Sequence, residues 1–376
     1  MMTTNTPDAT AGWYSNSAAR SWRTEPVGST VREFHHSLEG YTPTPLISVP
    51  ETAASLKIGA VFVKDESQRL GLPAFKILGA SYAISRALSA WLGSPHAALT
   101  LDELRSRLGV DSKLSLAAAT DGNHGRAVAH VAKLLGLGAT IYVPAEVSQA
   151  AMDAIRAEGA TLVELSVPYD DVVRHAKNAT GENVVLIQDT SWSGYEDIPQ
   201  WIVDGYDTMF AEIDEQLRDA GVEHLDLVIA PAGVGSFAQA VVAHYRSTEH
   251  QPAVLAVEPD TAPSVTTSLL AGRISSVPTA DTVMTGLNCG SVSGIAWPVL
   301  QAGLDASVTV TDSEALGAVR DLATQDVDSG PCGASTLAGA RAVLSDPARR
   351  AALGISADAV VVLLSTEGRA ANPKGF

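Results

Sequence analysis

Short apolar runs alternate with longer amphipathic segments along most of this chain. The apolar runs predict strands at residues 61–63, 114–119, 140–143, 161–165, 184–187, 225–230, 254–257, 307–310 and 359–364. Apolar positions at helical spacing predict helices at residues 81–92, 125–135, 148–158, 170–178, 198–220, 236–245, 313–324 and 335–344. Several strand runs are apolar throughout, which is typical of strands that are covered on both faces. The alternation therefore predicts an α/β protein with parallel sheets and right-handed crossovers.

The chain has 376 residues, which is enough for two domains of ordinary size. Hydrophobic residues make up 46% of it, so a sizeable core is expected and global disorder is excluded. The segment before Arg20 is rich in Thr, Ser, Asn and Ala, and we expect it to form a loose arm. The sequence contains no Pro/Gly-rich linker, so composition alone does not place a domain boundary.

The formal net charge of −17 limits the classes of partner. It argues against nucleic acid, which needs a basic face, and against anionic membranes. A small anionic ligand stays possible, because backbone amides at a helix start bind phosphate without any net positive charge. Lysine is scarce, so a lysine in an apolar setting stands out: the chain has Lys57, Lys64, Lys76, Lys113, Lys133, Lys177 and Lys374.

Cysteine usage and the first residues indicate the compartment. Cys289 and Cys332 are too few for a disulfide framework, and no Cys/His pair has the spacing of a zinc site, so we expect no metal. Residues 1–17 are polar and lack the apolar core of a signal peptide. No apolar stretch approaches the roughly 18 residues that span a membrane. These features predict a soluble cytoplasmic α/β protein, and we expect it to be an enzyme.

The first candidate chemical loop is residues 74–80, with the sequence AFKILGA. Its Lys76 has apolar neighbours just before a predicted helix. Desolvation disfavours an ammonium in such a site, so the amine could react with a carbonyl group to form a Schiff base. The alternative is a lysine whose stem packs while its charged end reaches water.

A second loop, TDGNHG at residues 120–125, follows an apolar strand where open α/β sheets bind ligands. Asn123 could hydrogen-bond a cofactor oxygen, and Asp121 could act as an acid or base. Both residue types are also common in ordinary turns and helix caps.

The third loop, APAGVGSFA at residues 230–238, again joins a strand to a helix. Its glycines let the backbone approach a phosphate, and the helix start supplies N–H groups and a positive dipole. The same stretch fits the pattern G-x-G-x-x-A, with Glu258 at the end of the next strand, so an NAD-dependent dehydrogenase is an alternative. A fourth loop, LLSTEG at residues 363–368, places hydroxyl groups at the end of the last strand.

Together the four loops resemble the fold-type II pyridoxal-phosphate enzymes, the group that contains threonine dehydratase and the tryptophan synthase β chain. Within that group the chain resembles the diaminopropionate ammonia-lyases. The segments that carry the resemblance are residues 74–83, 119–126, 188–195, 198–206, 232–237 and 365–368. The likeness extends from Thr42 to Gly368. Generic threonine dehydratases carry a serine where this chain has Asp121.

This resemblance implies an α/β protein of two domains, each with a largely parallel sheet flanked by helices, and pyridoxal 5′-phosphate in the cleft between them. Residues 1–76 with 195–376 would form the large domain and residues 77–194 the small one. The resemblance also implies a homodimer.

Residue roles follow from the same resemblance. Lys76 would be the Schiff-base lysine, and Asp121 and Asp189 match the two catalytic carboxylates of the family. Asn123 would contact the pyridoxal 3-oxygen. The phosphate would lie on the segment of Ala232, Gly233, Val234, Gly235, Ser236 and Phe237. Ser365 or Thr366 would face the pyridine nitrogen.

The implied reaction is the α,β-elimination of 2,3-diaminopropionate to pyruvate and ammonia, which makes the protein a carbon–nitrogen lyase. The β-amine leaves well when it is protonated, so the substrate brings a second ammonium to the site. A carboxylate such as that of Asp121 attracts this charge and can move protons, whereas a serine cannot supply the attraction. The resemblance further implies that the two carboxylates serve opposite stereoisomers, so that D and L forms both react.

Two segments depart from the family pattern. Residues 286–290 (GLNCG) are followed by Ser-Val-Ser at 291–293 instead of Glu-Pro-Ser, and residues 328–333 read DSGPCG instead of the pattern Glu-Ser-Gly-Ala-x-Gly. Both segments should lie near the cofactor or substrate. A dehydratase or lyase for serine, threonine or a hydroxyaspartate is therefore an alternative, as is a pyridoxal-phosphate-binding relative without catalysis.

Overall fold

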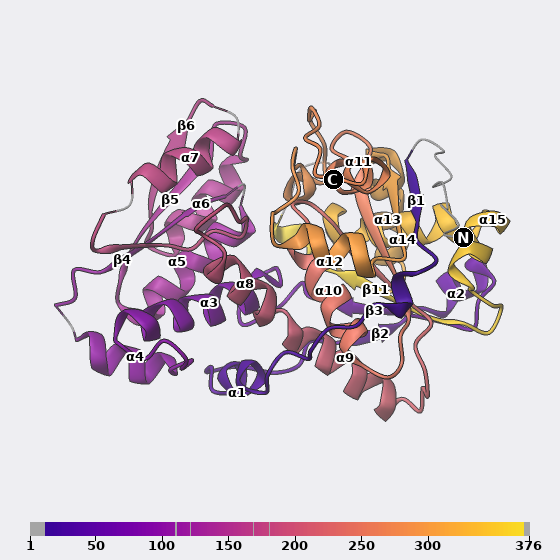
Figure 1. Ribbon diagram of the computed structural model, residues 1–376, viewed down its shortest axis with the longest axis horizontal. Coiled ribbons are helices and arrows are strands. Elements are labelled where there is room, and N and C mark those ends of the chain that lie inside the picture. The colour runs from indigo at the N-terminus through magenta and orange to yellow at the C-terminus, as the bar shows by residue number, and fades with distance from the viewer. Residues whose placement is uncertain (1–11, 110, 121, 168, 180, 372–376) are drawn as a thin grey trace, which may run out of the picture.

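The computed structural model describes residues 12–109, 111–120, 122–167, 169–179 and 181–371, and two β-sheets organise them (Figure 1). The larger sheet has seven strands in the order β1-β10-β9-β8-β11-β3-β2. Its strands are β1 (Trp13–Ser15), β2 (Leu46–Ser48), β3 (Ala60–Asp65), β8 (Leu227–Pro231), β9 (Ala253–Pro259), β10 (Ala306–Val310) and β11 (Val360–Ser365). The five inner strands run parallel, and the short edge strands β1 and β2 pair antiparallel.

The smaller sheet has four parallel strands in the order β6-β5-β4-β7. They are β4 (Ser115–Ala119), β5 (Gly138–Pro144), β6 (Thr161–Leu165) and β7 (Val184–Leu186). Figure 1 shows this sheet and its helices on one side of the molecule and the larger sheet on the other. Each predicted strand has its counterpart in one of the two sheets, and the α/β class is confirmed.

Helices fill the connections between strands, as parallel pairing requires. The α-helices are α1 (Thr30–His36), α2 (Pro50–Leu56), α3 (Lys76–Trp91), α4 (Leu101–Leu108), α5 (Asn123–Leu135), α6 (Gln149–Ala157), α7 (Tyr169–Ala179), α8 (Asp197–Gly205), α9 (Asp207–Asp219), α10 (Ser236–Ser247), α11 (Ser264–Ala271), α12 (Ala296–Gly303), α13 (Asp312–Ala323), α14 (Pro331–Leu344) and α15 (Pro347–Leu353). Short 3₁₀ turns occur at η1 (Ala19–Ser21), η2 (Thr285–Leu287) and η3 (Arg369–Ala371). None of the described helices is long and apolar enough to cross a membrane.

The two largest clusters of buried side chains lie on the two faces of the larger sheet. One core lies between its strands and α2, α13, α14 and α15. The other continues from the opposite face through α8, α9, α10 and α12 into α3, α5 and the smaller sheet. Because α3 packs along α8, the helix that begins at Lys76 belongs to the apolar contact between the two sheets.

Several expected elements differ in the structure. The segment from residue 12 to Arg20 is not a loose arm, because β1 pairs with β10 and Trp13 is only 4% exposed. Helix α3 begins at Lys76, five positions before the predicted start at residue 81. The predicted helix at residues 198–220 is two helices, α8 and α9, which meet at Tyr206. The domain boundaries after residues 76 and 194 stay a prediction.

Candidate active site

Loops from both sheets converge on one open cavity at the carboxyl ends of their strands, where open α/β sheets bind ligands. Segments after β4, β7, β8 and β11 form much of the cavity wall. The predicted site residues that line it are Lys76, Asn123, Asp189, Gly233, Val234, Gly235, Ser236, Phe237 and Thr366. Ala232 and Ser365 are not among its lining residues in the described part of the chain, and Asp121 lies outside the described residues.

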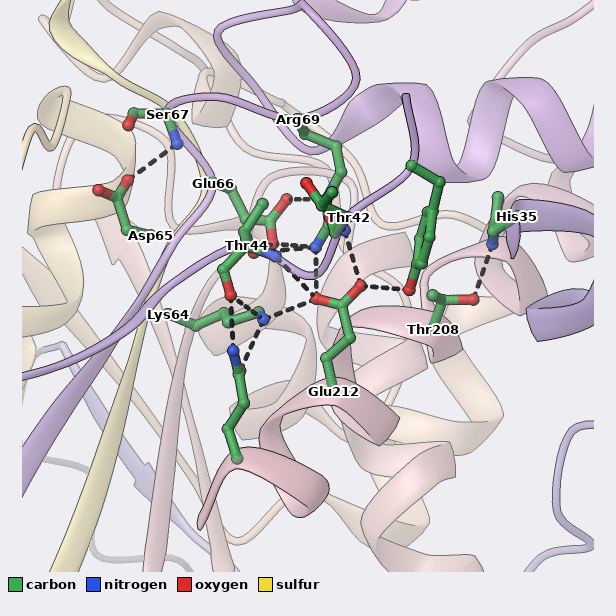
Figure 2. Close-up of polar contacts among 12 residues, drawn as sticks. His35, Thr42, Thr44, Lys64, Asp65, Glu66, Ser67, Arg69, Thr208 and Glu212 are labelled. Carbon is green, nitrogen blue, oxygen red and sulfur yellow. Dashed lines mark hydrogen bonds and ion pairs between the residues drawn. The ribbon is translucent and has the colours of Figure 1, made fainter. Parts of the chain in front are cut away.

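A buried charge network anchors the segment that leads from β3 to Lys76 (Figure 2). Arg69 Nη2 donates to Glu66 Oε1 at 2.6 Å, and Arg69 Nη1 donates to Glu212 Oε1 on α9 at 2.7 Å. Lys64, on β3, donates from Nζ to Glu212 Oε2 at 2.6 Å. Each of these four side chains is at most 1% exposed. The network therefore joins the start of the segment to α9.

Lys76 is the first residue of α3, and its ammonium faces Asp189. Just before it, Phe75 N donates to Thr366 O at 3.1 Å, which ties the helix start to the end of β11. Lys76 Nζ donates to Asp189 Oδ2 at 2.8 Å. The apolar neighbours in the sequence therefore do not isolate the amine. Burial alone would raise the pKa of Asp189, but Lys76 and His124 outweigh burial and lower that pKa to about 2.

Asn123 and His124 are the first residues of α5, after a turn in which Gly122 has a φ of +152°. His124 Nε2 donates to Ile187 O at 2.7 Å, which links this loop to the end of β7. Burial lowers the pKa of His124, so its ring is neutral and positions the loop. The Asn123 side chain faces the opposite sheet, where Nδ2 donates to Glu367 Oε2 at 2.7 Å.

The glycine loop between β8 and α10 exposes backbone to the cavity. Gly235 has a φ of +92°, and a Cβ there would lie 2.9 Å from Leu300 Cδ1. A Cβ at Gly233 would lie 3.0 Å from Cys289 Sγ. Ser236 then begins α10, a helix of 12 residues whose first turn has N–H groups without intrahelical partners. This combination of glycines and a helix start fits the phosphate of a cofactor.

Ser293, in one of the segments that depart from the family pattern, helps hold three loops together. Its N–H donates to Val234 O at 2.8 Å in the glycine loop, and its Oγ accepts from Ser191 N at 3.2 Å. Ser236 Oγ donates to Asp189 O at 2.8 Å. The glycine loop and the loop of Asp189 therefore come from different sheets but are fixed to each other.

The hydroxyl groups at the end of β11 differ in environment. Ser365 is fully buried, and its Oγ donates to Ser329 Oγ at 2.7 Å. A Cβ at Gly333 would lie 2.9 Å from Ser365 Oγ, so the glycine gives this serine its space. Thr366 lines the cavity.

Glu367 is a cavity residue that our sequence interpretation did not single out. It is 3% exposed and lies directly after the two hydroxyl residues. Burial raises its pKa, while the hydrogen bonds to Cys332 and Asn123 oppose the rise. Its place in the segment Ser-Thr-Glu-Gly, at the end of a buried strand, was the available signal. Cavity residues also come from the departing segments, which the sequence placed near the ligand: Gly286, Leu287, Cys289 and Cys332.

Glu258 does not have the position that a dinucleotide requires. It is fully buried, and its carboxyl oxygens accept from Val265 N and Thr266 N, both at 2.7 Å, at the start of α11. Burial raises its pKa to about 7 against these hydrogen bonds. The residue that the dehydrogenase interpretation needed for a ribose hydroxyl is therefore the cap of a helix. That interpretation is wrong.

Comparisons with known proteins agree with this geometry. A family model described as "Pyridoxal-phosphate dependent enzyme" matches residues 38–367. The diaminopropionate ammonia-lyase of Escherichia coli (strain K12) is 37% identical over 354 residues, which cover 90% of this chain and 87% of that protein. A crystal structure of the E. coli enzyme in its holo form superposes with a TM-score of 0.87 at 33% identity and covers 95% of this chain and 93% of that one. The same enzyme in complex with D-serine gives a TM-score of 0.85 at 34% identity, with coverage of 95% and 94%.

Proposed function

Since the chain belongs to the pyridoxal-phosphate dependent enzymes and, within them, to the diaminopropionate ammonia-lyases, we propose that it eliminates ammonia from 2,3-diaminopropionate. With the uptake of one molecule of water, the products are pyruvate and two molecules of ammonia. The observation that carries the proposal is the pairing of Lys76 with Asp189 in a cavity that also contains the glycine loop. One cavity thus contains an amine that can react with a carbonyl group, a carboxylate that can move protons and a helix start that can bind phosphate.

Pyridoxal phosphate, when bound, supplies the electron-accepting ring that makes the α C–H of an amino acid acidic. The amine of Lys76 would bind its carbonyl carbon, and Asn123 would hold its 3-oxygen. Backbone N–H groups of the glycine loop and of the first turn of α10 would hold its phosphate. A hydroxyl at the end of β11, from Ser365 or Thr366, would face its ring nitrogen.

Asp189 is the described carboxylate best placed to move a proton. Its low pKa depends on the Lys76 ammonium, which is the largest influence opposing burial. When the amine of Lys76 gives up its charge, that influence is lost, and the buried carboxylate binds a proton more readily. Asp189 therefore becomes a proton acceptor when the lysine reacts, and it can take the α-proton of the substrate while the β-amine, which is already protonated, leaves as ammonia.

The charge of the cavity favours a substrate with a second ammonium over one with a hydroxyl group. Two carboxylates, Asp189 and Glu367, lie among the described lining residues together with the amine of Lys76. The sequence adds Asp121 to the same loops as a further expected carboxylate. Serine and threonine carry a neutral group at the β-carbon and gain nothing from this charge. The diamine is therefore the substrate that the site supports best.

The deciding experiment compares pyruvate release from D- and L-2,3-diaminopropionate with release from serine and threonine. We expect both diamines to be the faster substrates. We also expect a visible absorbance band that borohydride abolishes, that the Lys76→Ala variant lacks, and that the exposed control Lys113→Ala keeps. Absence of the band from the native protein would end the cofactor assignment. Faster turnover of serine or threonine would assign a dehydratase instead.

We further propose that the protein is a homodimer in the cytoplasm. The likeness to the family supports the dimer, and the low cysteine content supports the compartment. Light scattering on the purified holoenzyme measures the first directly: we expect twice the chain mass of 39.0 kDa. A monomer mass would contradict it.

A further inference from the structure

The Glu367 side chain lies where three segments of the site meet. It follows β11, faces the start of α14 and reaches Asn123 at the start of α5. It is 3% exposed and lines the cavity. A carboxylate buried to this degree needs partners that donate hydrogen bonds, and it has them on both of its oxygens.

Both oxygens of the Glu367 carboxyl group accept hydrogen bonds. Its Oε2 accepts from Asn123 Nδ2 at 2.7 Å, and its Oε1 accepts from Cys332 N at 3.3 Å, in the first turn of α14. A negative charge is favourable there, because α14 has 14 residues and its dipole is positive at this end. Its main-chain oxygen accepts from Gly330 N at 2.8 Å. The two side-chain contacts therefore hold the carboxyl group between Asn123 and the start of α14.

This contact decides which way the Asn123 amide points. An asparagine side chain has a donor end and an acceptor end, and its neighbours determine which end faces which way. Both oxygens of the Glu367 carboxyl group accept hydrogen bonds in the structure, so the group faces the NH₂ end of Asn123 and disfavours the oxygen end. The NH₂ group has two N–H bonds and donates one of them to Glu367. The second is left for a partner in the cavity.

We propose that Glu367 is a positioning residue that fixes the Asn123 amide as a hydrogen-bond donor to the 3-oxygen of pyridoxal phosphate. The inference rests on the proposed function, because it needs the cofactor in this cavity. It assigns Glu367 a task that none of the residues predicted from the sequence performs. Without Glu367, the Asn123 amide could turn and present its oxygen to an oxygen of the cofactor, which would repel it.

The test uses holoenzyme with Glu367→Gln, Asn123→Ala and both changes together. Two quantities are measured: the pH midpoint at which the visible band of the bound cofactor changes, and the dissociation constant of the cofactor. A hydrogen bond between charged or polar buried groups contributes roughly 1.5 kcal/mol, so each single variant should weaken cofactor binding about tenfold. Each should also move the pH midpoint by about one unit.

The double variant separates positioning from independent effects. If Glu367 acts through Asn123, the double variant should resemble Asn123→Ala alone, because the interaction is lost only once. Effects that add would mean that Glu367 acts independently and would overturn the proposal. The proposal would also be overturned if Glu367→Gln changed the KM for the diamine and left the pH midpoint of the cofactor band unchanged. The carboxylate would then bind substrate instead of positioning Asn123.

Controls keep the result specific. Glu314 caps α13 and is not among the lining residues in the described part of the chain, so Glu314→Gln should leave midpoint and affinity unchanged. If Glu367→Gln does not fold, Glu367→Asp keeps the charge at α14 but shortens the side chain by one methylene. It should reproduce the shift, and a native midpoint in this variant would overturn the proposal. Absence of the band from the unmodified enzyme would instead refute the proposed function itself.

Discussion

Replacing Glu212 with Gln should lower the free energy of unfolding by about 3–5 kcal/mol, the usual cost of breaking a buried ion pair by removing one partner. Glu212 lies at the centre of the network in Figure 2. Its oxygens accept from Lys64 Nζ at 2.6 Å, from both Nη atoms of Arg69 at 2.7 and 2.8 Å, and from the Tyr41 hydroxyl at 2.7 Å. A glutamine would turn an NH₂ group toward these donors and leave two buried cations with less negative charge.

The pKa of Glu212 gives an independent magnitude. Burial would raise that pKa, but Arg69 and Lys64 lower it from 4.5 to about 2. A shift of this size corresponds to roughly 3 kcal/mol of stability. Burial lowers the pKa of Lys64 although the carboxylates of Glu212 and Glu66 oppose the shift, so the Lys64–Glu212 pair does not favour the charged form of both partners. Glu212 accepts hydrogen bonds from both cations, so its depressed pKa sets the magnitude of the effect. The stability lost in Glu212→Gln then comes chiefly from Lys64 and Arg69, which stay buried without their carboxylate partner.

The sign of the pH dependence follows from the depressed pKa. The stability from Glu212 is fully present above its unfolded pKa of 4.5 and is lost as the pH falls through about 2. The difference between native protein and Glu212→Gln should therefore shrink as the pH is lowered over this range. It should be constant from the upper end of the range to neutral pH.

The assay is urea unfolding at pH 7 and one fixed cofactor concentration, because bound cofactor adds to the apparent stability. The matched control is Glu215→Gln, three residues further along α9. Glu215 is 45% exposed in its pair with Arg32, so its loss should cost less than about 1 kcal/mol. Equal losses in the two variants would refute the reasoning that burial makes the network around Glu212 costly to break.

Three further predictions concern the glycine loop, the catalytic carboxylates and the buried His244 on α10. Gly235→Ala should weaken cofactor binding about tenfold or more, because its φ of +92° and the contact behind it leave no room for a side chain. Gly272→Ala, with a φ of +66° in open space, should cost about 1 kcal/mol of stability and leave that affinity unchanged. Asp189→Asn and Asp121→Asn should each abolish pyruvate release from a different enantiomer of the diamine, and equal losses on both enantiomers would contradict separate roles. Burial would lower the pKa of His244, but two aspartates raise it to about 9. Its stabilising contribution is therefore full below pH 6.5 and lost as the pH rises through about 9, and His244→Gln should remove this dependence from thermal unfolding.

The strands could be predicted from the sequence because most of them are buried on both faces. Residues 227–231 and 253–259 are buried without exception, and each forms a nearly continuous apolar run. The strands that escaped prediction, β1 and β2, have three residues each and lie at the edges of the sheet. A segment of that length shows no periodicity, and its pairing with a distant strand is what makes it a strand.

The helix starts near the site were harder to predict because side-chain pattern does not determine them. Lys76 begins α3 after the segment from β3 is tied to the end of β11, and that tie joins residues far apart in the sequence. The break between α8 and α9 has a similar origin. Gly79 in α3 and Gly205 at the end of α8 let α3 and α8 approach so closely that a Cβ at either glycine would meet the backbone of the other helix at 2.7 Å. Continuous helical periodicity across residues 198–220 conceals this break.

The site loops were recognisable one at a time, but their contacts were not. Asn123 and Glu367 are 244 residues apart, and nothing in either segment identifies the other as its partner. The pairing of Lys76 with Asp189 also crosses from one sheet to the other. Candidate residues for the chemistry could therefore be identified from the sequence of each loop. The electrostatics that set the pKa of Asp189 required the fold.

The glycine loop shows why a motif alone could not select the cofactor. Gly233 and Gly235 at a helix start suit any phosphate, whether it belongs to pyridoxal phosphate or to a dinucleotide. The decision depends on the acidic residue after the next strand, which a dinucleotide needs exposed at the sheet edge. Glu258 instead turns inward and accepts from the first N–H groups of α11. Freeing it for a ribose would leave those donors unsatisfied in the core, so the helix that it caps excludes the dinucleotide.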